Sequence, residues 1–471
     1  MSTPELPPAP AALFPDATTR TRIEDSLTRT LIAAGERVAR GSVTPTLDRE
    51  RLRQELTQFD FSRPQSLDEL IAWTVERLEH GVVHMNNPRY FGLFNPAANF
   101  PAQCADRIAG SFNPQLASSG SSPAPVEIEA CVIRAIAGRA GMPPGSAGHF
   151  TVSGSEANYT ALVCALTQAE PRFEREGVRG FSGPVAMYTS RECQPAWFKI
   201  VHQAGIGRDA LRLIGTDGHG RMDMAALAGR IREDRAHGVV PVLVSSTAGT
   251  TGAGMIDPLT ECDRVCREYG AWHHVDAAWG GAALASEQLR GLFAGIELAD
   301  SITIDAHKWF ATTMGCGMFI TRWPQVLSEA FKVAAEFMPS SVTALDPYLN
   351  TVQWSRRFLG LRLFLSLAAA GWSGYAAHVE RAAAVADRAR DLLVARGWRV
   401  VNDSRLAVLC VVPPQGYPPV KDLVKRVVGS GRAWVAASKT EGRDVVRICV
   451  THGETSASDV DALVAALEAK A

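Results

Sequence analysis

Short apolar segments alternate with helical stretches between residues 149 and 322, and this alternation constrains the fold more than any other feature. The apolar segments are His149–Ser153, Pro184–Thr189, Val240–Thr247, Trp272–Asp276, Ser301–Asp305 and Gly317–Thr321. Near-continuous apolar strands with helical crossovers are typical of a mainly parallel sheet covered on both faces. Several segments end in Gly, Ser, Thr or Asp, and such sheets bind ligands beyond the carboxyl ends of their strands. The sequence therefore predicts an α/β domain with a site at that edge.

Helical regions flank this alternating part. Before it, apolar residues at helical spacing form two series: Ile23, Leu27 and Leu31, then Leu67, Leu70, Ile71, Val75 and Leu78. We expect these N-terminal helices to wrap around a second copy of the chain.

A smaller α+β unit is predicted after Trp354. A long helical region there precedes strands at Trp398–Asn402, Ala407–Val412 and Val445–Thr451. A last helix over 459–469 is expected to begin with a capping box formed by Ser458 and Asp461. The predicted parts are residues 1–85 (helical, dimer-wrapping), 86–352 (large cofactor-binding domain) and 353–471 (small C-terminal domain).

Charge and cysteine usage exclude several classes of protein. The 471 residues include 48 Lys and Arg against 49 Asp and Glu, with no basic cluster, so we expect no nucleic-acid partner. The nine cysteines are scattered and odd in number, which indicates reduced thiols in a cytoplasmic protein. The longest apolar runs, such as Leu363–Ala370, are too short to span a bilayer, and the N-terminus lacks signal-peptide features. We therefore expect no membrane association.

Two strand ends have the strongest chemical signal. The segment HVDAAWGG (274–281) places Asp276 after one strand, and SITIDAHKWF (301–310) places His307 and Lys308 after another. A partly desolvated lysine at such an edge has the neutral amine needed for Schiff-base formation. A nearby carboxylate can keep a pyridine nitrogen protonated, which makes the ring an electron sink. The pair therefore predicts a pyridoxal-phosphate (PLP) site, although each residue alone is more often a solvated lysine or a strand-end cap.

Two further segments suit the rest of such a cofactor. In TVSGSEANYTAL (151–162), a strand and a Gly-Ser turn precede a helix, whose first N–H groups and the Ser155 hydroxyl suit a phosphate. In SSTAGTTGAGMIDPL (245–259), a strand ends at Thr247, which suits a phenolate oxygen. Alone, the first segment is equally typical of a capped helix and the second of a flexible loop.

These segments, in this order, resemble the group II PLP-dependent amino-acid decarboxylases, a family that includes aromatic-amino-acid, histidine and glutamate decarboxylases. The resemblance covers roughly residues 85–455 and includes YFGLFNPAANFPAQCADRIAG, SSPAPVEIEA and QWSRRFLGLRLF. It implies an aspartate-aminotransferase-like fold (PLP fold type I), a homodimer with its active site at the subunit interface, and Lys308 as the internal aldimine. It also implies that Asp276 pairs with the pyridine nitrogen and Ala278 packs against the ring. The positions it places around the phosphate are Gly154, Ser155, Asp305 and His307, and it places Thr247 near the phenolate.

The chain departs from the family at two positions. The family has a ring-stacking histidine where this chain reads TSRECQPAWFKIVH, so the stacking position holds Gln194, Pro195 or Trp197, of which we favour Gln194 or Pro195. The family's loop tyrosine, which protonates the substrate carbanion, aligns with Phe337. A phenyl ring cannot donate a proton, so the proton must come from another group.

The leading hypothesis is decarboxylation of an L-amino acid to the amine and carbon dioxide. Phe91, Phe94 and Phe337 favour an aromatic or other apolar substrate. The replaced His and Tyr leave a second hypothesis open, in which oxidative deamination to an aldehyde or another PLP-dependent bond cleavage occurs. A third hypothesis is a non-catalytic binding protein with a PLP fold.

We expect no metal ion. Four residues suggest zinc, but they lie on a predicted helix and in a buried strand: Cys262, Cys266, His273 and His274.

Overall fold

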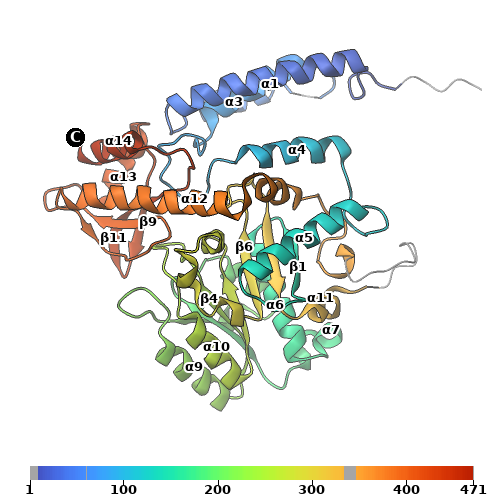
Figure 1. The fold of residues 1–471 in the computed structure, drawn as a ribbon, viewed down its shortest axis with the longest axis vertical. Coiled ribbons are helices and arrows are strands. Elements are labelled where there is room, and N and C mark those ends of the chain that lie inside the picture. Colours follow the sequence, from blue (N-terminus) through green and yellow to red (C-terminus); the bar gives the residue numbers. More distant parts are fainter. Residues whose placement is uncertain (1–8, 60, 334–345, 470–471) are drawn as a thin grey trace, which may run out of the picture.

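A seven-stranded sheet forms the centre of the protein, whose computed structural model describes residues 9–59, 61–333 and 346–469 (Figure 1). Its strands are β1 (Ala147–Thr151), β2 (Val185–Ser190), β3 (Leu211–Ile214), β4 (Val240–Thr247), β5 (Trp272–Asp276), β6 (Ser301–Asp305) and β7 (Gly317–Thr321). Their order is β1-β7-β6-β5-β4-β2-β3. Neighbours from β3 to β6 run parallel, and β7 is antiparallel to both β6 and β1. The predicted α/β class with a mainly parallel sheet is confirmed.

Helices cover both faces of this sheet. On one face α6 (Gly154–Ala169) and α8 (Trp197–Gln203) share a core with Met187. On the other face α9 (Met224–Ala236) and α10 (Leu259–Tyr269) share a core with Tyr188. Successive residues of a strand point to opposite faces, so strands covered on both sides are buried along their whole length. This explains why the central strands read as continuous apolar runs.

The N-terminal helices pair with one another at the edge of the molecule. Ion pairs between Arg22 and Asp68 and between Arg37 and Glu79 join α1 (Ala17–Arg40) to α3 (Leu67–Gly81), which run side by side in Figure 1. The other helices before the C-terminal part are α2 (Arg49–Leu56), α4 (Phe100–Phe112), α5 (Pro123–Arg139), α7 (Phe173–Glu176) and α11 (Pro324–Phe331). In the described ranges, no helix has the length and apolar character needed to cross a bilayer.

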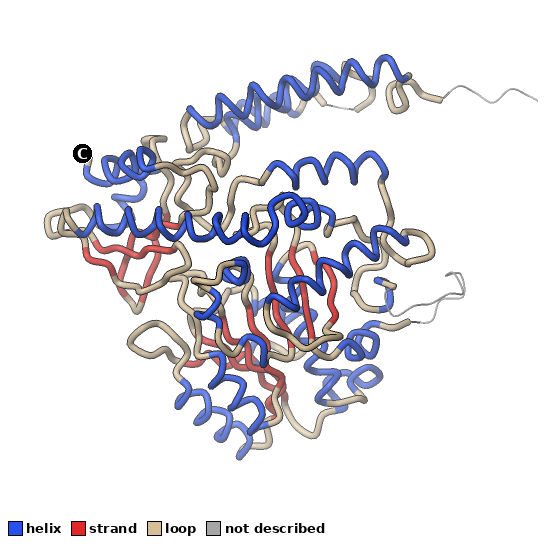
Figure 2. The backbone as a smooth tube through the Cα atoms, viewed as in Figure 1, coloured by secondary structure: helices blue, strands red, loops and turns tan. Residues whose placement is uncertain are grey.

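A small antiparallel sheet follows the long helix α12 (Leu361–Val394), as Figure 2 shows. Its order is β10-β11-β9-β8, with bounds β8 (Arg399–Val400), β9 (Val408–Val412), β10 (Ala436–Thr440) and β11 (Arg443–Cys449). The last helices are α13 (Val420–Gly429) and α14 (Ala457–Glu468). The Phe91 N–H donates to the Trp434 carbonyl, and the Cys449 N–H donates to the Phe91 carbonyl, so the segment before the large sheet also contacts this unit. The domain boundaries at residues 85 and 352 stay a prediction.

Some local predictions were wrong. The last helix begins with a capping box of Ser456 and Asp459, not of Ser458 and Asp461. An S-x-x-D pattern occurs at both positions, and the earlier start adds about half a turn of backbone hydrogen bonds. The predicted strand Trp398–Asn402 is reduced to two residues, Arg399–Val400. Strands β3 and β10 were not predicted, because both are short edge strands with solvent-facing side chains.

Candidate active site

Lys308 lies just past the carboxyl end of β6, next to a buried carboxylate. Its Nζ is 3.1 Å from Asp305 Oδ2, and its side chain keeps 21% of its surface exposed. The Nε2 atom of His307 lies 3.7 Å from the same carboxylate oxygen, and its Nδ1 accepts a hydrogen bond from the Cys316 N–H. The lysine amine is therefore held by a specific partner and still faces open space.

Asp276 ends the neighbouring strand and is almost fully buried. Its Oδ2 accepts a hydrogen bond from Asn158 Nδ2 at 2.9 Å, and its Oδ1 accepts one from the Ala278 N–H at 3.1 Å. Burial raises the pKa of Asp276, while the charge of Lys308 and these two hydrogen bonds oppose the rise. Thr247 stands beside Asp276 in the parallel pair of β4 and β5. The structure thus brings six of the predicted residues to one edge of the sheet: Thr247, Asp276, Ala278, Asp305, His307 and Lys308.

The start of α6 meets the same edge. A Cβ atom added at Gly154 would lie 2.7 Å from Asp305 Oδ2, so only glycine allows the helix to start this close to the carboxylate. The first N–H groups of a helix have no carbonyl partner within it and suit an anion. Ser155 lines a pocket of about 750 Å³ together with Gln194 and Pro195. The Gln194 side chain accepts a hydrogen bond from the Ala196 N–H, next to the start of α8.

Three stacked aromatic rings lie near Lys308, and the guanidinium group of Arg447 contacts the first of them. Phe94 stacks on Trp279 with 4.2 Å between ring centres, and Trp279 stacks on Trp309 at 4.7 Å. The other neighbours of the Phe94 ring are Lys308 Nζ, 5.9 Å from its centre, and the Arg447 guanidinium carbon, at 4.6 Å. The structure places Phe94 near Lys308, and its contact with a substrate stays a prediction.

Two of the predicted substrate residues are not placed against Lys308. Phe91 is fully buried in the core, and its backbone pairs with the small C-terminal unit. Phe337 lies outside the described residues. Their contact with a substrate stays a prediction.

Two residues at the site were missed by sequence reasoning. Asn158 lies one helical turn after Gly154, so the i, i+4 spacing places both on the face of α6 that meets the sheet. Arg447 comes from β11, far away in the sequence, and nothing in its local motif indicates that it reaches Phe94.

Three groups at the site match the parts of pyridoxal phosphate. Lys308 has an amine for the aldehyde, Asp276 has a buried carboxylate for a ring nitrogen, and the start of α6 has N–H groups for the phosphate. In the described part of the chain, the buried Asp305 Oδ1 has no hydrogen-bond partner, so this oxygen can accept a hydrogen bond from a ligand. These groups fit the cofactor.

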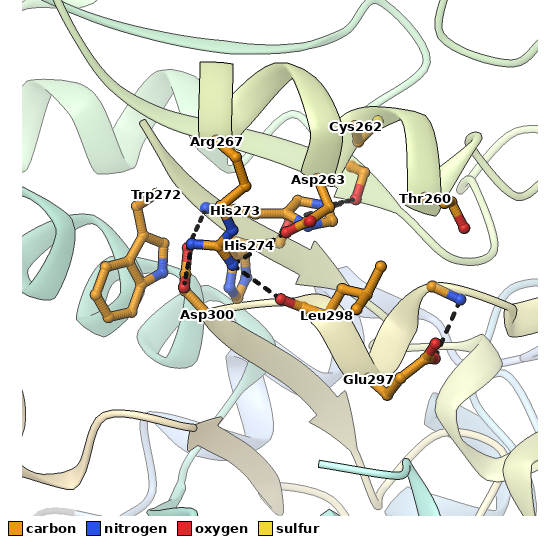
Figure 3. Close-up of polar contacts among 12 residues, drawn as sticks. Thr260, Cys262, Asp263, Arg267, Trp272, His273, His274, Glu297, Leu298 and Asp300 are labelled. Atoms are coloured by element: carbon orange, nitrogen blue, oxygen red, sulfur yellow. Dashed lines mark hydrogen bonds and ion pairs between the residues drawn. The ribbon is translucent and has the colours of Figure 1, made fainter. Parts of the chain in front are cut away.

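The residues considered for zinc do not converge. In Figure 3, His273 lies beside Asp263, and its Nδ1 is 3.7 Å from Asp263 Oδ1. Arg267 forms an ion pair with Asp300 nearby. His274 bonds Asn158 on the opposite face of the sheet. No cluster of three possible metal ligands occurs within residues 9–59, 61–333 and 346–469.

Comparisons with known proteins identify relatives of this chain. The pyridoxal-dependent decarboxylase conserved domain matches residues 50–411. An aromatic-L-amino-acid decarboxylase of Bacillus atrophaeus is 27% identical over 435 residues, which cover 89% of this chain and 88% of the relative. The cysteine sulfinic acid decarboxylase of Mus musculus is 31% identical over 372 residues, 77% of this chain and 75% of the relative. A crystal structure of mouse CSAD superimposes with a TM-score of 0.90 at 27% identity and covers 96% of this chain and 98% of that one.

Proposed function

The chain belongs to the pyridoxal-dependent decarboxylase family, and from this premise we propose that it converts an L-amino acid to the amine and carbon dioxide, with Lys308 as the cofactor lysine. As a member, it is a pyridoxal-phosphate-dependent carboxy-lyase that acts on an amino acid. The observation that supports the assignment to Lys308 is its position beside Asp305 and close enough to Asp276 to influence its ionisation.

Each residue of the site has a role in this proposal. Bound pyridoxal phosphate supplies a protonated ring that accepts the electrons released when the bond to the substrate carboxylate breaks. Asp276 holds the proton at the ring nitrogen, and Asp305 orients the Lys308 amine. The small side chain of Ala278 leaves room for a flat ring. The residues proposed to surround the phosphate are Gly154, Ser155, Asp305 and His307, and Thr247 would lie near the phenolate.

The substrate side chain that we propose is aromatic or otherwise apolar. Phe94 gives the site an apolar wall next to Lys308. Arg447 is 97% buried, and within the described residues its side chain donates hydrogen bonds to the backbone carbonyls of Gly92, Thr251 and Gly252. A buried cation whose partners are neutral favours an anionic ligand, and the substrate's α-carboxylate is one.

The test is product analysis with the purified holoenzyme. A panel of aromatic, aliphatic and acidic amino acids is supplied, and amine and carbon dioxide are quantified by mass spectrometry. We expect an aromatic or aliphatic amino acid to give equal amounts of both. Turnover of acidic substrates alone would overturn the proposed substrate class.

A lysine variant tests the cofactor attachment. After borohydride reduction, the wild-type protein should contain a covalent cofactor adduct, and Lys308→Ala should contain none and lose activity. Lys421→Ala, in which an exposed lysine of α13 is removed, is the control and should retain the adduct. An adduct in Lys308→Ala would contradict the assignment.

One observation favours a second outcome, decarboxylation with oxidative deamination to an aldehyde. Gln194 and Pro195 line the pocket next to Ser155, where the family has its ring-stacking histidine. The same panel, run in the presence of dioxygen as the oxidant, decides between the outcomes. The amino acid, dioxygen and water would then give aldehyde, carbon dioxide, ammonia and hydrogen peroxide in place of the amine.

We also propose a cytoplasmic homodimer with the active site at the subunit interface. Large apolar side chains are exposed on α4 (Phe100, Ile108 and Phe112) and on the N-terminal pair (Leu31, Ile32 and Leu78). Val152, two residues before Gly154, is also exposed. The cytoplasmic location rests on the nine cysteines, all of which are free thiols.

A further inference from the structure

A chain of hydrogen bonds runs beneath α6 and ends on Asp276. Its members are nearly or fully buried and come from β5, β6 and α6: Trp272, Ser301, His274, Asn158 and Asp276. The successive distances are 2.8 Å from Trp272 Nε1 to Ser301 Oγ, 2.8 Å from Ser301 Oγ to His274 Nδ1, 3.0 Å from His274 Nε2 to Asn158 Oδ1, and 2.9 Å from Asn158 Nδ2 to Asp276 Oδ2. Residues 272, 274 and 276 alternate along β5, so all three side chains point to the face under α6.

The carboxylate end of this chain fixes the direction of its donors. An ionised carboxylate only accepts, so the Asn158 amide N–H faces Asp276 and the Asn158 Oδ1 faces His274. His274 Nε2 therefore has the imidazole proton and donates it to Asn158 Oδ1, with Thr303 Oγ1 also 3.3 Å from this nitrogen. The neutral imidazole then accepts at Nδ1 from the Ser301 hydroxyl, which itself accepts from the Trp272 indole N–H.

This arrangement favours an ionised Asp276, because a proton on Oδ2 that pointed toward Asn158 would oppose the Asn158 donor.

We propose that His274 and Asn158 are positioning residues that keep Asp276 ionised and fixed for the ring nitrogen of the cofactor. The inference rests on the proposed function, since it needs Asp276 to bond that nitrogen. A pyridine ring stays protonated only beside an anion, so the donors that hold this anion also control the ring.

The burial of His274 and Asp276 agrees with this role. Burial lowers the pKa of His274 to about 3, so the imidazole is neutral and adds no charge that competes with the ring proton. Burial raises the pKa of Asp276, and the Asn158 hydrogen bond counteracts the rise. Without the His274 donor, the Asn158 amide can turn its oxygen toward the carboxylate.

The adjacent histidine is a matched control. His273 is as deeply buried as His274 and belongs to the same strand, but it faces α10, where its Nε2 contacts Ser246 Oγ at 2.9 Å and its Nδ1 lies 3.7 Å from Asp263 (Figure 3). In the described part of the chain, it forms no hydrogen bond with Asn158 or Asp276. A change at His273 therefore disturbs the core without disturbing the carboxylate.

The experiment compares two cofactors on the apoenzyme. Dissociation constants are measured for pyridoxal phosphate and for its 1-deaza analogue, in which CH replaces the ring nitrogen. The ratio of the two constants, deaza over natural, reports the contact between the carboxylate and the ring nitrogen. A general loss of packing weakens both cofactors and leaves the ratio unchanged.

We expect Asp276→Ala to abolish the preference, and His274→Phe and Asn158→Leu each to lower the ratio by about tenfold, as for a lost hydrogen bond to a charged group. His274→Gln, whose amide can donate near the position of Nε2, should stay within about threefold of wild type. His273→Phe should keep the wild-type ratio.

The results distinguish a failure of the positioning role from a failure of the assignment of Asp276. If Asp276→Ala loses the preference while folded His274→Phe and Asn158→Leu keep it, the positioning role is overturned and the proposed function stands. If Asp276→Ala keeps the preference, the assignment of Asp276 itself fails. Should His274→Phe not fold, Asn158→Leu decides the question, because it tests the last donor of the chain directly.

Discussion

Buried histidines in this protein differ in whether they have hydrogen-bond partners. His274 bonds Ser301 and Asn158 in the chain that ends on Asp276. His149, in β1, is as deeply buried, but in the described part of the chain neither ring nitrogen has a hydrogen-bond partner. Burial lowers the pKa of His149 to about 3. A buried polar ring without partners contributes little to stability and makes the fold sensitive to acid.

We predict that His149→Phe reduces the acid sensitivity of the fold. The folded pKa lies below the unfolded value of about 6.5, so the unfolded state binds more protons at acid pH and stability falls as pH decreases below 6.5. Each pH unit below 6.5 lowers the free energy of unfolding by about 1.4 kcal/mol because of this histidine. A phenyl ring does not titrate, so the variant has no such loss. Free energies of unfolding measured from pH 7 to pH 4 should therefore decline less steeply in the variant.

The exposed His202 on α8 provides the control for this measurement. His202→Ala should follow the wild-type pH dependence. Buried Asp257, whose pKa is raised to about 6, opposes the histidine effect between pH 4 and 6 in all three proteins, so it cancels in the comparison. Equal slopes for wild type and His149→Phe would contradict the prediction.

At the scale of single elements, the start of α14 depends on one serine. Ser456 Oγ accepts a hydrogen bond from the Asp459 N–H, and the Asp459 carboxylate accepts one from the Ser456 N–H. We predict that Ser456→Ala lowers the free energy of unfolding by about 1 kcal/mol, as for the loss of an N-cap. Ser458→Ala, inside the first turn, should cost clearly less. Chemical denaturation of both variants checks this, and a larger loss for Ser458→Ala would restore the start predicted from the sequence.

The elements that sequence reasoning predicted well are those buried on both faces. Strands β4, β5, β6 and β7 have the predicted bounds, because a strand covered on both sides must be apolar along its whole length. Edge strands such as β10, with the sequence AASKT, have no such requirement and give no apolar run.

The topology of the sheet also explains which residues of the site could be predicted from the sequence. Asp276 ends a predicted strand, and Gly154 and Lys308 come just after two others, so topology alone brings them to one edge. Arg447 comes from the other sheet, and Asn158 bonds Asp276 across 118 residues of sequence. The spacing from Gly154 places Asn158 on the face of α6 that meets the sheet, but its bond to Asp276 and the contact of Arg447 with Phe94 depend on how distant elements pack.

At the scale of the whole molecule, the N-terminal helices and α4 leave an apolar surface uncovered. Phe112 and Phe100, at the two ends of α4, expose 81% and 73% of their surface. A single chain gains nothing from exposed phenyl rings, whereas a second copy that covers them gains about 25 cal/mol for each Å² of apolar area buried. This surface is where we expect the proposed dimer to form.

We predict that the double variant Phe100→Asp and Phe112→Asp is a monomer at concentrations where the wild type is a dimer, because each carboxylate would have to lose its water in the interface. Sedimentation equilibrium measures the change, and a dissociation constant raised at least about a hundredfold is expected from two such penalties. Leu213→Asp, at an exposed position of the edge strand β3 on another part of the molecule, is the matched control and should remain a dimer. Because the proposed dimer has its active site at the subunit interface, the monomeric variant should also bind pyridoxal phosphate more weakly than the control. A double variant that stays dimeric would show that the subunits meet elsewhere.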